Sequence, residues 1–416
     1  MEPDTANQGA AILPDWLGGI ALLLAAAFGL AWLLRRSGFP GAAAVGGVLA
    51  GLLLGPGVLG RVAPAVHDRL FGAAPAEWAA WRDAERAVDA TQFVVGQAEV
   101  DPASARAQVE TLVSEAEARK TAWTDAVERK RRPFLMLAFA LGLAVLLASS
   151  LAPPEGNSGE SRANGRAITL GAWTAFLPAV LAAVGLGWLG EPAWSPTMLA
   201  AMAAVAFGAW PLVAADREPL RDSVPGGLAT LRTAALVANA IAIGFLGASA
   251  IVASHPLAMI GLAGAAAVAV LVPPLARSIG SERRSMAAIP ILVPPLAALA
   301  AVRIEPFLDL RWAPVIVLPL IAEDGRWLGG TLGAWLPGGV RFPVALRIGL
   351  ASIPAGPGMV AAIAIGLQAG VLAPTVGGGL LVGVLLIEIL APIRGRFAAD
   401  LARTETGTGT GDRTGS

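Results

Sequence analysis

Residues 38–60 read GFPGAAAVGGVLAGLLLGPGVLG, an apolar stretch without a single polar side chain. Glycine recurs in it at positions 41, 46, 47, 51, 55, 57 and 60. Small residues let neighbouring helices approach closely inside a membrane. Because proline cannot continue a regular helix, Gly55-Pro56-Gly57 is expected to end or unwind it. The stretch therefore predicts a membrane helix that packs tightly on its neighbours.

The composition of the whole chain agrees with a membrane location. Of its 416 residues, 56% are hydrophobic and 14% are charged, and the mean hydropathy is +0.67. An ordinary soluble protein has about 25% charged residues, so this chain cannot cover itself with polar groups and must lie in lipid. A soluble enzyme and a disordered protein are excluded. The net charge of +0 gives no field that would attract nucleic acid.

The residues that usually bind metals or perform catalysis are scarce. The chain has no cysteine and only two histidines, His67 and His255. No segment combines a nucleophile with a base, and no phosphate-binding loop occurs. We therefore expect no metal site, no cofactor and no enzymatic activity.

Long apolar runs predict an all-α polytopic membrane protein. A run of about 20 residues crosses the ~30 Å hydrocarbon layer as a helix. We predict about eleven transmembrane helices, with approximate limits 14–35, 39–60, 133–153, 168–189, 196–215, 228–253, 256–277, 286–303, 312–336, 343–369 and 373–394. None of the runs alternates as a membrane β-strand would.

The arginines predict the orientation in a bacterial inner membrane, because loops on the cytoplasmic side are enriched in basic residues. The amino terminus is predicted outside and the carboxyl terminus inside, so that most arginines between spans face the cytoplasm, for example Arg35, Arg36, Arg283, Arg284 and Arg394. One basic cluster opposes this orientation: residues 129–132 read RKRR on the predicted outer side.

The chain divides into four predicted parts. Residues 1–60 hold the first two spans, and residues 133–396 form the membrane core. Residues 61–132 carry 23 of the 60 charges and show two helical apolar stripes, which predicts a helical hairpin outside the membrane. The hairpin either packs only on itself or binds a partner or gates the core. Residues 397–416 are predicted to form a disordered tail.

Two later spans contain proline and glycine where a membrane helix would be continuous. Residues 207–213 read FGAWPLV, and residues 352–358 read SIPAGPG. The interrupting residues are Gly208, Ala209, Trp210 and Pro211 in the first span, and Pro354, Gly356, Pro357 and Gly358 in the second. Paired interruptions in two halves of a chain point to the binding site of an inverted-repeat transporter. The alternative is that both are simple proline kinks.

The sequence resembles the cation:proton antiporter superfamily, in particular its Kef-like branch. The resemblance rests on residues 36–60, where the family pattern is filled by Arg36, Gly38, Pro40, Gly46, Ala50, Gly51, Gly55, Pro56, Leu59 and Gly60. It extends to the interrupted spans, to Arg326-Trp327-Leu328-Gly329-Gly330 and to residues 343–394. The resemblance implies an inverted-repeat fold with two broken, crossing helices. It also implies exchange of Na⁺ or K⁺ against protons, and a possible homodimer.

Four residues are candidates for the ion site, Asn239 and Arg326 from the resemblance and Glu323 and Asp324 as charges inside a predicted span. Asn239 stands where the family carries the aspartate that binds either a cation or a proton, and asparagine cannot titrate. Arg326 matches the basic residue that balances this aspartate. Glu323 and Asp324 are the nearest titratable replacements, and we expect Glu323, one turn away, to pair with Arg326. Glu388, near Arg394, is expected to be paired or to reach the membrane surface.

Three functions remain open at this point. The first is a divergent transporter of monovalent cations and protons. The second is a non-transporting scaffold or sensor with the same fold, which the loss of the aspartate at Asn239 favours. The third is an unrelated transporter of an organic anion. A titratable group that faces the two interrupted spans would support the first function over the second.

Overall fold

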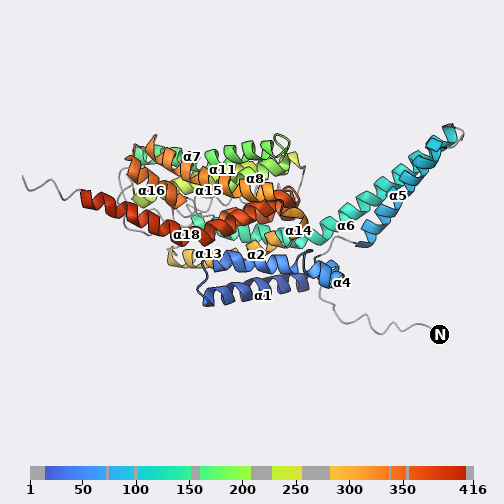
Figure 1. Cartoon of the computed structure of the whole chain (residues 1–416), viewed down its shortest axis with the longest axis horizontal. Helices are drawn as coiled ribbons and strands as arrows, with labels where there is room; N and C mark the ends of the chain where they lie inside the picture. The colour runs from blue at the N-terminus through green and yellow to red at the C-terminus, as the bar shows by residue number, and fades with distance from the viewer. Residues whose placement is uncertain are drawn as a thin grey trace, which may run out of the picture. The chain divides into compact units, whose positions relative to one another are not determined.

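The computed structural model describes residues 15–71, 75–97, 102–150, 160–207, 227–254, 282–336, 339–352 and 356–408 (Figure 1). Within these ranges the regular secondary structure is entirely helical. The helices are α1 (Asp15–Arg36), α2 (Ala42–Leu54), α3 (Leu59–Val62), α4 (Pro64–Leu70), α5 (Pro75–Gln97), α6 (Pro102–Ser150), α7 (Glu160–Trp188), α8 (Pro196–Ala206), α11 (Gly227–Val252), α13 (Glu282–Ala301), α14 (Pro306–Asp309), α15 (Trp312–Trp335), α16 (Phe342–Ser352), α17 (Gly356–Ala369) and α18 (Pro374–Thr408).

The described chain forms two compact units. Unit 1 comprises residues 1–22 and 58–136, and unit 2 comprises residues 23–57 and 137–416. The division passes through α1 and α6, each of which contributes residues to both units.

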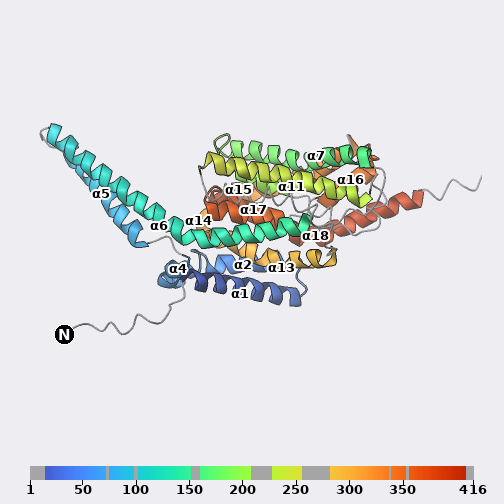
Figure 2. The same cartoon turned by 180° about the vertical axis from the view of Figure 1, so that it is seen from behind.

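Unit 1 contains the helical pair α5 and α6. The two helices run alongside each other (Figure 2), and the rings of Trp81 and Trp123 stack with their centroids 5.2 Å apart. Trp123 also packs against the buried side chains of Ala126 and Val127. Ion pairs between residues three or four apart, such as Arg82 with Glu85, occupy the exposed faces. The stacked tryptophans therefore provide an apolar contact between the two helices.

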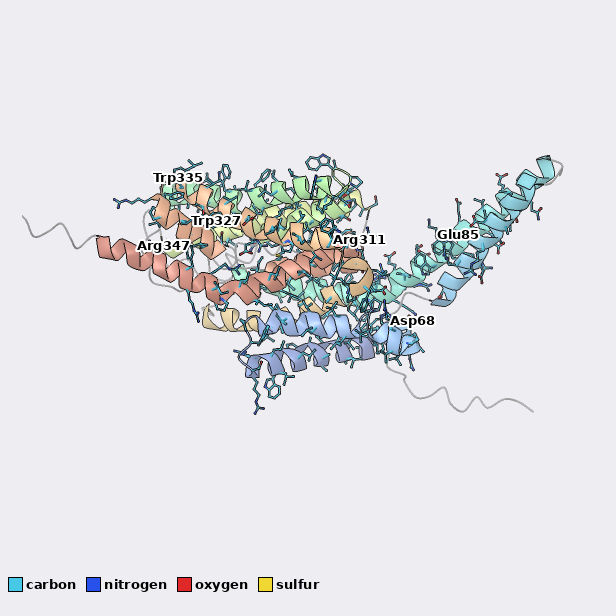
Figure 3. The ribbon with its side chains drawn as sticks, in the orientation of Figure 1. Asp68, Glu85, Arg311, Trp327, Trp335 and Arg347 are labelled. Atoms are coloured by element: carbon cyan, nitrogen blue, oxygen red, sulfur yellow. The ribbon has the colours of Figure 1, made fainter. Side chains whose placement is uncertain are left out.

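Five segments are long and apolar enough to cross a membrane, within the described residues. They are Trp16–Arg36, Ala42–Val62, Ala167–Trp188, Thr233–Val252 and Pro374–Arg394. Exposed tryptophans stand at several helix ends, as at Trp188 and at Trp312, the first residue of α15. Trp335 stands at the other end of α15 (Figure 3). Tryptophan prefers the membrane–water interface. The chain is thus an α-helical integral membrane protein.

The glycines of α2 form a close helix contact, as the sequence predicts. A Cβ on Gly51 would lie 2.5 Å from the carbonyl oxygen of Ala298 on α13. A Cβ on Gly47 would overlap the carbonyl oxygen of Pro294, and one on Gly46 would overlap the backbone of Ala31 on α1. Because α2 meets α1 and α13 backbone to backbone, only glycine fits at these positions.

Gly51→Ala should destabilise the protein, whereas Gly244→Ala should not. Alanine is better than glycine in a helix by about 1 kcal/mol, and Gly244 on α11 has open space around its Cα. At Gly51 the added methyl group must displace α13, which costs about 1–3 kcal/mol. Unfolding of the two purified variants in detergent measures the difference. Equal stability of both variants would contradict the close contact of α2 with α13.

The remaining helices of unit 2 surround α8, α15 and α17. Helices α7 and α11 pack on each other, and both pack on α8. Helix α15 packs on α7, α16 and α18, and α17 packs on α13 and α8 (Figures 1 and 2). Every side chain of α8 from Met198 to Ala206 is buried. This short helix is therefore at the centre of the unit.

Two boundaries differ from those predicted. Helix α6 continues through Pro133, where the sequence predicts that a separate span begins; a proline removes one backbone hydrogen bond but does not have to end a helix that packs on both sides of it. The disordered tail predicted for residues 397–416 is wrong for its first part, because α18 continues to Thr408. Alanine and leucine at 398–402 favour helix there.

Candidate functional site

The candidate site is the place where the end of α8 meets the start of α17, here called the α8/α17 junction. A Cβ on Gly358 would lie 3.1 Å from Cδ1 of Phe207, the residue that caps α8. Phe207 and Gly358 belong to the two spans that the sequence predicts to be interrupted. Gly208, Ala209, Trp210 and Pro211 lie outside the described residues, and so does Pro354. The described edges of the two spans are thus in contact.

Both helices of the junction are fixed at their other ends. Ser195 caps α8 by accepting a hydrogen bond from the amide of Met198 at 3.1 Å, as serine does at helix starts. The Thr197 hydroxyl contacts the loop between α17 and α18: it donates to the Val371 carbonyl at 3.3 Å and accepts from the Ala373 amide at 3.2 Å. These bonds hold α8 in register with α17.

Arg326 occupies the junction. Arg326 is 1% exposed, which is exceptional for a charged residue among apolar helices. Its Nε donates to the carbonyl of Val205 in the last turn of α8 at 3.1 Å. Its Nη2 lies 2.9 Å from Sδ of Met359 in the first turn of α17. A positive charge beside the carbonyl end of a helix is favourable, so the guanidinium holds the end of α8 beside α17.

Glycines on two faces of α15 allow Arg326 this position. A Cβ on Gly325 would lie 2.7 Å from Cα of Pro178 on α7, and one on Gly329 would lie 2.6 Å from the carbonyl oxygen of Trp173. On another face, a Cβ on Gly330 would lie 2.5 Å from Oγ of Ser352 on α16. Ser352 in turn donates to the carbonyl oxygen of Arg326 at 2.8 Å. The glycines therefore place α15 deep between α7 and α16.

The predicted pairing of Arg326 with Glu323 is wrong. Glu323 instead forms an ion pair with Arg394 of α18, with 2.6 Å between Oε1 and Nη1. Residues 323 and 326 are three apart, but tertiary packing turns Arg326 toward α8 and α17, while Glu323 faces α18. The spacing of three residues on one helix was therefore not enough to make Glu323 the ion-pair partner of Arg326.

Asp324 and Asn239 are not members of this ion pair. Asp324 is exposed on α15, in line with the exposed side chains of Leu320 and Leu328. Asn239 is buried on α11, which packs on α8. Of the four ion-site candidates, Arg326 is the one for which the described residues show hydrogen bonds to both helices of the junction.

Sequence reasoning missed Gln368, a buried polar residue of α17. Its side-chain amide donates to the carbonyl of Leu299 in the last turn of α13 at 2.7 Å, and its Oε1 accepts from Nε of Arg303 at 3.0 Å. In the sequence, the signal for Gln368 is a single side-chain amide within an apolar helix, because such a group needs hydrogen-bond partners when it is buried. Gln368 therefore donates a hydrogen bond to a carbonyl at the end of α13 and holds α17 against α13.

No cluster of three potential metal-ligating residues occurs within the described residues. No protein-family model matches the sequence, and no curated protein matches it.

Proposed function

We propose that this protein is a divergent secondary transporter that exchanges a monovalent cation, Na⁺ or K⁺, against protons through the α8/α17 junction. The observation that carries the proposal is the fully buried Arg326, which contacts the end of α8 and the start of α17 at once. A charge deep in a membrane protein is costly and commonly marks an ion pathway.

The arrangement of helix ends supports the same function. Helix ends at membrane depth leave backbone groups without partners inside the helix, and such groups are tolerated where they line a cavity or contact each other. The meeting of Phe207 with Gly358 brings two such ends together. From the resemblance to Kef-like antiporters, the proposal also includes about eleven transmembrane spans, an inverted-repeat fold and a homodimer in a bacterial inner membrane.

The test of this function is exchange by the purified protein in lipid vesicles. Vesicles that contain a pH-sensitive dye receive a gradient of Na⁺ or of K⁺, and we expect a change of internal pH that protein-free vesicles do not show. The readout identifies the cation directly. A folded protein that moves no protons under either gradient would contradict the proposal.

A non-transporting scaffold or sensor is the second candidate. It is favoured by Asn239, a buried asparagine that cannot exchange a proton for a cation. Under this alternative Arg326 would serve only to hold α8 against α17. The vesicle experiment separates the two candidates, because a scaffold gives no flux with either cation although it remains folded.

The proposed orientation places the amino terminus and the hairpin of α5 and α6 outside. The chain lacks cysteine, so a single introduced thiol gives an unambiguous signal. A cysteine that replaces Ser114, which is exposed on α6, should react with an impermeant thiol reagent added to intact cells. The matched variant Ser37→Cys, after α1, should react only in permeabilised cells. The opposite labelling pattern would reverse the orientation.

A further inference from the structure

A cavity of about 550 Å³ lies in unit 2, between α1, α2, α13, α17 and α18. Most of its lining is apolar, for example Phe28, Trp32 and Val384. Two charged side chains also line it, Arg35 of α1 and Glu388 of α18. A carboxylate among apolar side chains and lipid is unfavourable unless other groups compensate it.

The start of α17, which belongs to the α8/α17 junction, forms part of the cavity wall. Pro357 at the start of α17 lines the cavity. The next residue, Gly358, touches Phe207 of α8, and the one after it, Met359, contacts Arg326. Three consecutive residues therefore connect the cavity wall to the buried arginine.

Charge compensation links Glu388 to the same arginine. Glu388 interacts electrostatically with Arg394 of its own helix and with Arg326 of α15. Arg394 is also paired with Glu323, at 2.6 Å. With Glu388 ionised, these two carboxylates and two guanidinium groups sum to zero, and Arg35 adds one positive charge to the lining of the cavity. Binding of one proton or of one monovalent cation at Glu388 raises the total by the same single charge.

The other helices packed on α18 add few charges within the described residues. Helix α16 carries the buried Arg347, and α14 carries Asp309, whose backbone lies beside Gly378 near the start of α18. The loop before α2 meets Glu388 through Gly41: its φ is +68° and a Cβ there would lie 2.7 Å from Cβ of Glu388. Only glycine suits this position, so the backbone approaches Glu388 from that side.

We propose that Glu388 is the exchange site of the transporter and that the cavity is its access path. This inference rests on the proposed transport function and names its titratable group. When a cation binds, the O–H bond of the protonated carboxyl group breaks, the proton leaves to water in the cavity, and the carboxylate binds one Na⁺ or K⁺. The reverse step releases the cation as the carboxylate takes a proton back.

Glu388 suits this exchange better than the carboxylates of α15. Glu323 is engaged by Arg394 at 2.6 Å, and a cation would have to displace this guanidinium. Asp324 is exposed in line with Leu320 and Leu328 and is absent from the lining of the cavity. Among the carboxylates within the described residues, Glu388 is the one that both lines the cavity and interacts electrostatically with Arg326.

The transport test compares Glu388→Gln with the matched variant Glu110→Gln, which changes an exposed carboxylate of α6. In the dye-loaded vesicles we expect Glu388→Gln to fall to the rate of protein-free vesicles and Glu110→Gln to keep the wild-type rate. Glu388→Asp, which retains a carboxyl group, should keep exchange with a shifted pH dependence. Wild-type exchange in Glu388→Gln would overturn the inference.

A second measurement on the full-length protein does not depend on transport. Infrared difference spectra should show the carbonyl band of a protonated carboxyl group that disappears when Na⁺ or K⁺ is added at constant pH. Loss of this band in Glu388→Gln would support the site even if the wild-type protein moved no ions, in which case only the transport function would fail. A cation-sensitive band that persists in Glu388→Gln, or that is absent from the wild type, would overturn the assignment.

Discussion

Replacing Arg326 with glutamine is expected to reduce cation-dependent proton flux to the rate of protein-free vesicles. Arg326 is 1% exposed and contacts both Val205 at the end of α8 and Met359 at the start of α17. Glutamine removes the positive charge at the junction and is too short to reach both helices. Flux in vesicles loaded with a pH-sensitive dye measures the loss.

A lysine at the same position separates the charge of Arg326 from its geometry. Arg326→Lys keeps the positive charge, but one ammonium group cannot reproduce the planar fork of a guanidinium. We expect partial flux in Arg326→Lys.

The glutamine variant should also be less stable than the wild type. Loss of the hydrogen bond to the Val205 carbonyl should lower the free energy of unfolding of Arg326→Gln by about 1–3 kcal/mol, the usual cost of a buried polar group left without its partner.

The matched control for Arg326 is Arg341→Gln, which removes an exposed arginine just before α16. This variant should exchange ions at the wild-type rate. If folded Arg326→Gln also exchanged ions at the wild-type rate, the junction would not be the transport site. If the wild-type protein exchanged nothing while Arg326→Gln lost stability, the arginine would have the structural role of the scaffold alternative.

Breaking the ion pair between Glu323 and Arg394 should have the largest effect on stability. The two charged groups are 2.6 Å apart, and their side chains are 29% and 13% exposed. Removing one partner leaves the other charge largely buried. We therefore expect Glu323→Gln or Arg394→Gln to lower the free energy of unfolding by about 3 kcal/mol, the lower end of the range for breaking a buried pair.

The double variant Glu323→Gln, Arg394→Gln tests whether this loss comes from the pair itself. Removing both charges leaves no uncompensated ion, so the double variant should be more stable than either single variant. Unfolding of all four proteins in detergent gives the coupling free energy of the two residues. Additive losses would show that Glu323 and Arg394 stabilise the protein through separate contacts.

Sequence reasoning was most successful where a physical rule acts within a single helix. Apolar length predicted a helical membrane protein, because a lipid layer requires a continuous apolar run. Within the described residues, five of the predicted spans are helices long and apolar enough to cross a membrane. The glycines of residues 38–60 predicted a close contact, and Gly51 meets the backbone of Ala298. By contrast, helix continuity through Pro133 and up to Thr408 was missed, since proline and charged residues only bias a helix toward its end.

Charge partners were beyond the reach of the sequence. Glu323 and Arg326 share one helix, yet Glu323 pairs with Arg394, which is 71 residues away in the chain. Gln368 likewise bonds to Leu299 and Arg303 of another part of unit 2. A buried polar group takes whichever partner the packing of neighbouring helices brings within hydrogen-bond distance, and no local pattern encodes that choice.

The sequence by itself determined that the chain is a helical membrane protein, that α2 packs through glycine, and that Arg326 lies in an apolar helix where a charge requires a reason. Only the tertiary structure decided that Arg326 faces the ends of α8 and α17 and that Glu388 lines a cavity beside α17. The physical reason is that hydrophobicity and helix propensity are properties of neighbouring residues along the chain. The surroundings of a buried charge are instead set by helices far apart in the sequence, whose relative rotation depends on the packing of all of them together.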